Sequence, residues 1–314
     1  MCGQVGTAMA GSFSDISESS SDYTMLENLK TIGVISGYPD GTFQPDLQVS
    51  RAEALKMILK TSGKPEPAGD VQTSFSDVPL DSWFAGYAME GKDMGIISGN
   101  PDGTFGPDAN VNKAEFIKML LKAFNENIDN YDFTALQQTI AVDVTWSDWF
   151  YPYFAFAKMD GLITPDLNNQ LEPNHSLTRM ECAVLLYKYY ILKNGGDIEQ
   201  MLGIAEKNLA DVPAELNANN LVTAFNEAND AVFYNGLALG LQPNSHSVTG
   251  TNDIALGFRQ LVTAYHAKSQ SNPDLAQSLV DEANSDANDA VTHDSSLQSL
   301  ADQINQLGTS LMAQ

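Results

Sequence analysis

Apolar and polar positions in the first two thirds of the chain alternate in a way that predicts pairs of short helices. Trp83, Tyr87 and Met94 recur at about helical spacing, and Gly95 follows as the left-handed residue that commonly ends a helix. A second segment behind residue 112 is apolar over more than one face, which is typical of a buried helix. The pattern therefore predicts a helix–turn–helix unit whose second helix is buried.

This unit occurs three times. A shift of 62 residues aligns, without a gap, 13–15 with 75–77, 33–43 with 95–105 and 50–53 with 112–115. A further shift of 66 residues aligns 83–84 with 149–150, 95–97 with 161–163 and 112–115 with 178–181. The third copy has Asn168 and Asn169 in place of the Pro-Asp-Gly turn, and asparagine also tolerates the left-handed conformation that such a turn requires.

Each second helix opens with the signature of a capping box. The expected N-caps are Ser50, Asn112 and Thr178, and the glutamates three residues later are Glu53, Glu115 and Glu181. A carboxylate at this position can accept a hydrogen bond from the N–H of the cap residue. We therefore interpret the glutamates as structural.

The first helical position in each copy holds a cation: Arg51, Lys113 and Arg179. A cation is unfavourable there, by roughly 0.3–1 kcal/mol, because the N-terminal end of a helix is electropositive. One interpretation is an ion pair with a carboxylate of a neighbouring copy. The other is an anion site, because a guanidinium beside the free N–H groups of a helix start offers paired donors to a carboxylate.

These residues together resemble the S-layer homology (SLH) domain in three tandem copies over residues 13–193. The resemblance implies a pseudo-threefold, three-pronged spindle whose inter-prong grooves bind a secondary cell-wall polysaccharide, often one that carries pyruvate. It also implies that the cation, the Trp-Phe aromatic and the glycine-rich loop of each motif line a groove. The binding residues implied are Arg51, Lys113, Arg179, Trp83, Trp149, Gly37, Asp40, Gly99 and Asp102.

The three copies depart from the family pattern in different ways. The first has Ser21 and Asp22 where the others have the Trp-Phe pair. The second has Lys113, which lacks the planar donor fork of arginine. The third has Pro165 at the position of Gly99. We therefore predict that the three grooves bind unequally.

The predicted division of the chain follows from the repeat and from a change in composition after Gly196. We expect an N-terminal tail at 1–12, in which the sequence at 8–10 resembles a signal-peptidase site, SLH motifs at 13–64, 75–125 and 141–193, and a helical domain at 197–314. Helical periodicity in the last domain predicts helices over 197–210, 214–240, 252–270, 273–291 and 295–312, with a break at Pro213. The predicted fold is mainly α: the spindle plus an all-α bundle of four to five helices.

Composition, charge and the absence of known motifs exclude several classes of protein. With 16 Lys+Arg against 40 Asp+Glu, the net charge of -24 argues against nucleic-acid binding. No run of apolar residues is long enough for a membrane span. The two cysteines, Cys2 and Cys182, exclude a disulfide-rich scaffold, and the four histidines are scattered. We find no motif of a catalytic, cofactor or metal site, and the Pro-Asp-Gly loops indicate turns rather than calcium sites.

The expected function is non-covalent anchoring at the cell surface. The partner implied is a cell-wall polysaccharide linked to peptidoglycan. We expect the protein to be secreted and to lie at the cell wall or in the surface layer. Residues 197–314 would serve surface-layer assembly, spacing, self-association or binding of another surface protein. The alternatives are a wall-anchored enzyme, such as a glycan hydrolase, or an adhesin, with the activity in residues 197–314.

Overall fold

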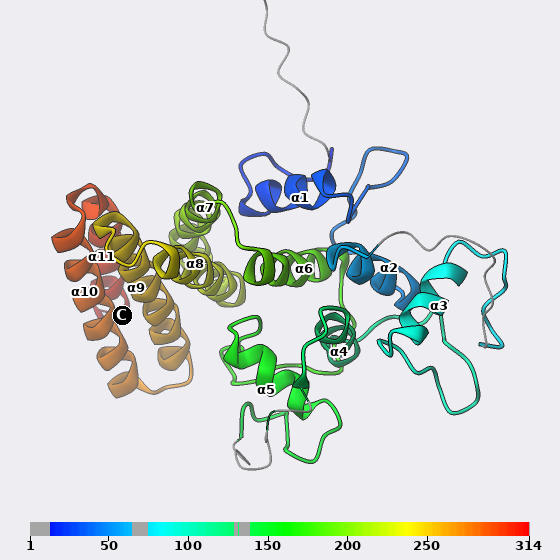
Figure 1. Cartoon of the computed structure of the whole chain (residues 1–314). Helices are drawn as coiled ribbons and strands as arrows, with labels where there is room; N and C mark the ends of the chain where they lie inside the picture. The colour runs from blue at the N-terminus through cyan, green and yellow to red at the C-terminus, as the bar shows by residue number, and fades with distance from the viewer. Residues whose placement is uncertain (1–12, 65–74, 129–130, 132–138, 314) are drawn as a thin grey trace, which may run out of the picture. The chain divides into compact units, whose positions relative to one another are not determined.

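The computed structural model describes residues 13–64, 75–128, 131 and 139–313, and this part of the chain is helical with no extended strand (Figure 1). The α-helices are α1 (Ser21–Thr31), α2 (Arg51–Thr61), α3 (Ala85–Asp93), α4 (Lys113–Ala123), α5 (Tyr151–Met159), α6 (Arg179–Asn194), α7 (Ile198–Asn217), α8 (Leu221–Leu241), α9 (His246–Ser269), α10 (Pro273–His293) and α11 (Gln298–Ala313). The mainly α prediction is confirmed. The predicted tail at 1–12, with Cys2, lies outside the described residues.

The chain divides into two compact units. The first comprises Met1–Asp132, Pro152–Phe154 and Pro173–Tyr190, and the second comprises Phe133–Tyr151, Ala155–Glu172 and Ile191–Gln314. The first unit thus contains the first two motifs and most of α6, whereas the larger part of the third motif belongs to the second unit. The predicted domain boundaries themselves stay predictions.

A cyclic set of backbone hydrogen bonds joins the three motifs inside the first unit. The N–H of Val49 donates to the Leu177 carbonyl at 3.0 Å, that of Leu177 to Val111 at 3.0 Å, and that of Val111 to Val49 at 2.9 Å. All three residues are fully or almost fully buried. Because each motif donates to one neighbour and accepts from the other, the first unit has the pseudo-threefold centre that the resemblance implied.

An aspartate fixes the loop of each motif in the same way. Asp15 accepts hydrogen bonds from the N–H groups of Phe43 and Gln44, both at 2.7 Å. The equivalent pairs are Asp77 with Phe105 and Gly106 in the first unit, at 2.7 Å each, and Asp143 with Leu171 and Glu172 in the second, at 2.9 and 2.7 Å. The third motif therefore shares this feature although its turn differs in sequence. Asn169 has a positive φ of 58°, and Gly41 and Gly103 at the equivalent positions of the other motifs also have a positive φ, 83° each.

The predicted capping boxes are present at all three inner helices. Ser50 and Asn112 cap α2 and α4 with their side chains, and Glu53 and Glu115 accept hydrogen bonds from the cap N–H groups. At α6, the N–H of Thr178 donates to Glu181 at 2.8 Å and the N–H of Glu181 donates to the Thr178 hydroxyl at 3.3 Å. The structural interpretation of the three glutamates is confirmed.

In the second unit, α7 to α11 pack as a bundle, as predicted, but the break expected at Pro213 is wrong. Helix α7 runs through Pro213 to Asn217, and the chain turns at Asn219, whose φ is 61°. Proline removes one helical hydrogen bond, yet Val212 and Leu216 remain buried on either side of it. Apolar packing therefore maintains the helix across the proline.

Helices α9 and α10 lie side by side (Figure 1) and approach closely because small residues face one another. A Cβ atom added to Gly257 of α9 would lie 3.1 Å from the carbonyl oxygen of Ala283 on α10. The buried face of α10 consists mainly of alanines: Ala276, Ala283, Ala287 and Ala290, with Val280. Helix α9 also starts six residues before the predicted position, at His246, where Ser245 caps it.

Candidate ligand-binding site

A cavity of about 220 Å³ lies in the first unit, and we call it the Arg179 cavity. Its lining comprises residues 33–38 together with Glu53, Lys56, Met57, Lys60, Trp83 and Arg179. These residues come from all three motifs: the loop and inner helix of the first, the aromatic of the second and the helix start of the third. The cyclic arrangement of the inner helices brings them together.

Arg179 is held in place by contacts with the loop of the first motif. Its Nε donates to the carbonyl oxygen of Phe43 at 2.9 Å, and its guanidinium carbon lies 4.8 Å from the ring centre of Tyr38 and 4.9 Å from that of Phe43. Only 9% of the residue is exposed. Among the described residues, no carboxylate lies within ion-pair distance of Arg179. The guanidinium therefore carries its charge into the cavity without a partner anion.

Two lysines and a tryptophan extend this surface. Lys56 lies with its ammonium group 5.2 Å from the ring centre of Trp83, and Lys60 follows one helical turn later on α2. Trp83 is 54% exposed and packs edge-on against Phe84, with ring centres 5.4 Å apart. The cavity thus combines three cations and one carboxylate, that of Glu53, with an exposed aromatic face. Such a surface favours an anionic ligand that also presents apolar C–H groups.

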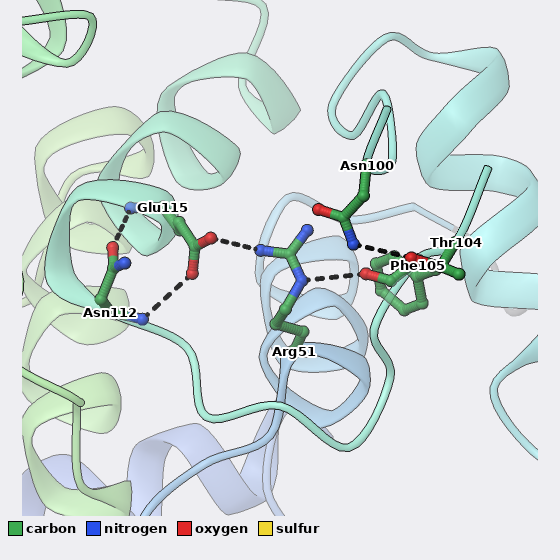
Figure 2. A network of polar contacts seen from close by, with 6 residues as sticks. All are labelled: Arg51, Asn100, Thr104, Phe105, Asn112 and Glu115. Atoms are coloured by element: carbon green, nitrogen blue, oxygen red, sulfur yellow. Dashed lines mark hydrogen bonds and ion pairs between the residues drawn. The ribbon is translucent and has the colours of Figure 1, made fainter. Parts of the chain in front are cut away.

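Arg51 occupies the equivalent place beside the loop of the second motif, and we call its surroundings the Arg51 site. Its Nε donates to the Phe105 carbonyl at 3.1 Å, as Arg179 does to Phe43. Unlike Arg179, it forms an ion pair: Nη1 lies 2.8 Å from Oε1 of Glu115 (Figure 2). The interpretation of an ion pair between neighbouring motifs is therefore confirmed for Arg51 and does not hold for Arg179.

The Arg51 site also contains two lysines in the positions of Lys56 and Lys60, namely Lys118 and Lys122. Burial, then the charges of Lys122 and Arg51, lower the pKa of Lys118, whereas Glu115 opposes this effect. The three cations therefore lie close enough to repel one another. Glu115 compensates part of this repulsion by its ion pair with Arg51.

One premise of the anion-site prediction is wrong: the first N–H groups of the inner helices are not free. The N–H of Arg51 donates to the Ala109 carbonyl at 2.9 Å, that of Lys113 to His175 at 2.9 Å, and that of Arg179 to Leu47 at 2.8 Å. The next residues donate to Pro107, Pro173 and Pro45 in the same cyclic order. The helix starts are occupied by inter-motif hydrogen bonds, so anion binding here must rely on side chains.

The predicted site residues fall into three groups. Gly37, Trp83 and Arg179 line the Arg179 cavity. Gly37 has no room for a side chain, because a Cβ there would lie 2.7 Å from the ring of Phe13. Gly99 lies in the loop of the second motif, and Arg51 lies beside that loop. The backbone N–H of Lys113 donates to the carbonyl oxygen of His175. Trp149 lies in the second unit, exposed and packed edge-on against Phe150.

Asp40 and Asp102 are not among the residues that line the cavity, and each instead shapes its own turn. Asp40 accepts hydrogen bonds from the hydroxyl and N–H of Thr42 at 2.6 and 3.0 Å, and Asp102 does the same with Thr104. The hydroxyl bond, and then the N–H bond, hold the pKa of both carboxyls below its usual value. The described contacts of the two aspartates are thus those of turn residues.

Among the cavity residues that were not predicted as site residues, Tyr38, Lys56 and Lys60 bring an aromatic ring and two positive charges. The repeat contained a signal for the two lysines, because the 62-residue shift aligns Lys56 with Lys118 and Lys60 with Lys122.

In the described ranges, no group of three His, Cys, Asp or Glu side chains is arranged to hold a metal ion. Across the same ranges, every helix is too short or too polar to cross a membrane.

Comparison with known proteins agrees with this geometry. Residues 12–55 and 74–117 match the S-layer homology domain. These two segments are S-layer homology domains, a class of module that binds cell-wall polysaccharide and anchors proteins at the cell surface. Residues 141–193, outside both matches, share the capping box, the loop aspartate and the cyclic hydrogen bonds of the two matched motifs.

The relatives of the chain include proteins named for the cell surface and proteins named as enzymes, such as an amylopullulanase of Thermoanaerobacterium thermosulfurigenes. The chain is 28% identical over 158 residues to cell surface glycoprotein 1 of Acetivibrio thermocellus, 32% over 100 residues to the surface layer protein of Brevibacillus choshinensis, and 32% over 154 residues to the cellulosome-anchoring protein of A. thermocellus. The matches cover 48%, 31% and 48% of this chain but only 7%, 9% and 34% of those proteins. Domain and relatives together indicate a location at the cell surface.

Proposed function

We propose that the Arg179 cavity binds an acidic unit of a cell-wall polysaccharide and that this contact anchors the chain. The observation that carries the proposal is the state of Arg179, whose guanidinium is mostly buried, oriented by Phe43 and Tyr38, and not paired with a carboxylate. In a chain of net charge -24, an unpaired arginine beside two lysines is a local exception to a repelling field. A carboxylate on the sugar supplies the missing anion.

The side chains that line the cavity contact different parts of the ligand, according to their chemistry. The Nη atoms of Arg179 donate hydrogen bonds to the carboxylate, and Lys56 and Lys60 add positive charge. The exposed face of Trp83 packs against the C–H groups of a sugar ring. Raising the salt concentration should weaken binding if these local ion pairs dominate, whereas it should strengthen binding if the overall negative charge limits association.

We further propose that residues 197–314 act without catalysis, in surface-layer assembly, spacing or partner binding. Support comes from the name of one relative, cellulosome-anchoring protein, although two other relatives are named amylopullulanase and exoglucanase XynX. The alternative of a wall-anchored enzyme is favoured by the two relatives named as enzymes and by the raised pKa of the Asp286 carboxyl on α10. Loss of glycan-hydrolysing activity in Asp286→Asn would support that alternative, and absence of such activity in the unaltered chain would exclude it for the glycans tested.

The test of the anchoring proposal is the affinity for purified wall polysaccharide before and after mild acid removes its ketal-linked pyruvate. We expect the affinity of the full chain to fall at least tenfold when the carboxylate is removed. Equal affinity for both polymers would contradict the proposal, because no anion would then be needed at Arg179. Titration followed by tryptophan fluorescence provides the measurement, since Trp83 lines the cavity.

A further inference from the structure

The Arg179 cavity and the Arg51 site share the same backbone but differ in the state of the arginine. In the first loop, Tyr38 donates from its N–H to the Thr42 carbonyl at 2.9 Å, and in the second Asn100 does the same to Thr104 at 2.7 Å. Each arginine then donates from Nε to the residue that follows that threonine. The backbone therefore does not explain why only Arg51 is paired with a carboxylate.

The two glutamates of the inner helices differ in what they contact. Glu115 accepts from the Asn112 N–H with Oε2, at 3.2 Å, and pairs with Arg51 through Oε1. Glu53 directs Oε2 to the N–H and hydroxyl of Ser50, at 2.9 and 3.0 Å, and is not ion-paired with Arg179. A ligand carboxylate at Arg51 must therefore compete with Glu115, whereas at Arg179 the corresponding position is open.

The residue at position 38 or 100 also differs between the two sites: Tyr38 lies beside Arg179, and Asn100 lies beside Arg51. Tyr38 presents its ring 4.8 Å from the guanidinium carbon of Arg179, which is an attractive cation–π arrangement. Asn100 has no ring, and its amide turns to the hydroxyl of Thr104 at 2.9 Å, beside Arg51 (Figure 2). With no aromatic contact from position 100, the Arg51 guanidinium extends to Glu115.

We propose that Tyr38 and Asn100 are positioning residues that decide whether the arginine beside them is available to an anionic ligand. Tyr38 keeps Arg179 in the cavity and away from Glu53, and Asn100 leaves Arg51 to pair with Glu115. This inference rests on the proposed function, because it assigns polymer binding to the Arg179 cavity and a closed state to the Arg51 site. It also predicts that one substitution opens the closed site.

The test follows the arginine side chains directly by ¹⁵N NMR of the full chain, with pyruvate as the probe carboxylate. The chain has three arginines, at 51, 179 and 259, so their signals can be assigned by single substitution. In the unaltered protein, we expect pyruvate to shift the signals of Arg179 and not those of Arg51. Asn100→Tyr should make Arg51 respond as Arg179 does, and Tyr38→Asn should abolish the response of Arg179.

Two further variants separate the proposal from other causes. Glu115→Gln retains the capping box, which accepts glutamine, but removes the ion pair, so it should make Arg51 respond to pyruvate without any change at position 100. Ser50→Asn transfers the cap residue of α4 to α2 and should leave the Arg179 response unchanged.

The proposal would be overturned by a response of Arg51 in the unaltered protein or by a retained response of Arg179 in Tyr38→Asn. It would equally be overturned by no response of Arg51 in Asn100→Tyr or in Glu115→Gln, or by loss of the Arg179 response in Ser50→Asn. Each of these measurements follows the NMR signals of the arginine side chains and does not depend on polymer binding. If the unaltered protein fails to bind wall polymer, the proposed function fails while these readings still decide the role of positions 38 and 100.

Discussion

The Nε of Arg179 donates to the carbonyl oxygen of Phe43 at 2.9 Å, which links residues 136 positions apart in the sequence. The first helical residue of the third motif thereby completes the loop of the first, and the cavity depends on both. The same link between Arg51 and Phe105 connects the first motif to the second.

Arg179→Ala should reduce both polymer binding and stability. It removes the unpaired cation from the cavity and leaves the Phe43 carbonyl without its donor, which costs about 1–3 kcal/mol of unfolding free energy. Arg179→Lys should restore part of the binding, because a lysine carries the charge but not the planar donor fork. Binding to purified polymer and urea denaturation provide the two measurements, and full binding by Arg179→Ala would contradict the role of this residue.

Trp83→Ala should weaken polymer binding with little loss of stability. The side chain is 54% exposed and lines the cavity, so its removal affects ligand contact more than packing. Trp146→Ala is the matched control, because Trp146 is 63% exposed and is not among the residues that line the cavity. Equal losses of affinity in the two variants would show that the effect is not specific to the cavity.

Asp77→Asn should destabilise the second loop. The carboxylate accepts two N–H hydrogen bonds at 2.7 Å, from Phe105 and Gly106, and an amide can accept only one of them in the same geometry. The expected loss is about 1.5–3 kcal/mol, the range for a hydrogen bond to a charged group. Asp81→Asn, at an exposed position nearby, should change the unfolding free energy by less than about 0.5 kcal/mol.

The bundle should lose stability as the pH rises from about 4 to above 6. Burial, followed by the nearby carboxylates of Asp253, Asp289 and Glu282, raises the pKa of Asp286 to about 6, against the opposing charge of Arg259. A raised carboxyl pKa in the folded state means that the folded state binds the proton more tightly. This contribution is fully present below the ordinary value of 3.8 and is lost as the pH rises through about 6.

Asp286→Asn tests this dependence, because an amide stays neutral at every pH. Its melting temperature should be close to that of the unaltered protein near pH 4 and exceed it by a few degrees near pH 7, at roughly 2–4 °C per kcal/mol. Asp302→Asn, on an exposed position of α11, is the control and should not show this difference. If the difference in melting temperature between Asp286→Asn and the unaltered protein were the same at pH 4 and pH 7, the raised pKa of Asp286 would be contradicted.

The sequence predicted local features of the fold well because each depends on neighbouring residues. Capping boxes, left-handed glycines and the turn at Asn169 follow from residue type and spacing, and the repeat placed them in register. The break at Pro213 was predicted wrongly because the burial of Val212 and Leu216, a tertiary effect, outweighs the local preference of proline.

The candidate site was predictable only in part. The repeat identified Arg51, Lys113 and Arg179 as equivalent positions but not their states, since these depend on residues from other motifs. The ion pair of Arg51 requires Glu115, 64 positions away, and the cavity lined by Arg179 requires Tyr38 and Trp83. The occupied N–H groups at the helix starts likewise depend on carbonyls of a neighbouring motif, which the sequence of one motif does not reveal.

The most direct test of the account is co-sedimentation of the full chain with wall sacculi, before and after acid removes the polysaccharide, for the unaltered protein, Arg179→Ala and Arg51→Ala. The unaltered protein should pellet with intact sacculi and not with stripped ones. Arg179→Ala should lose at least tenfold in affinity, whereas Arg51→Ala should lose much less, because Arg51 is already paired with Glu115. Equal losses in the two variants, or equal pelleting with stripped sacculi, would contradict the account.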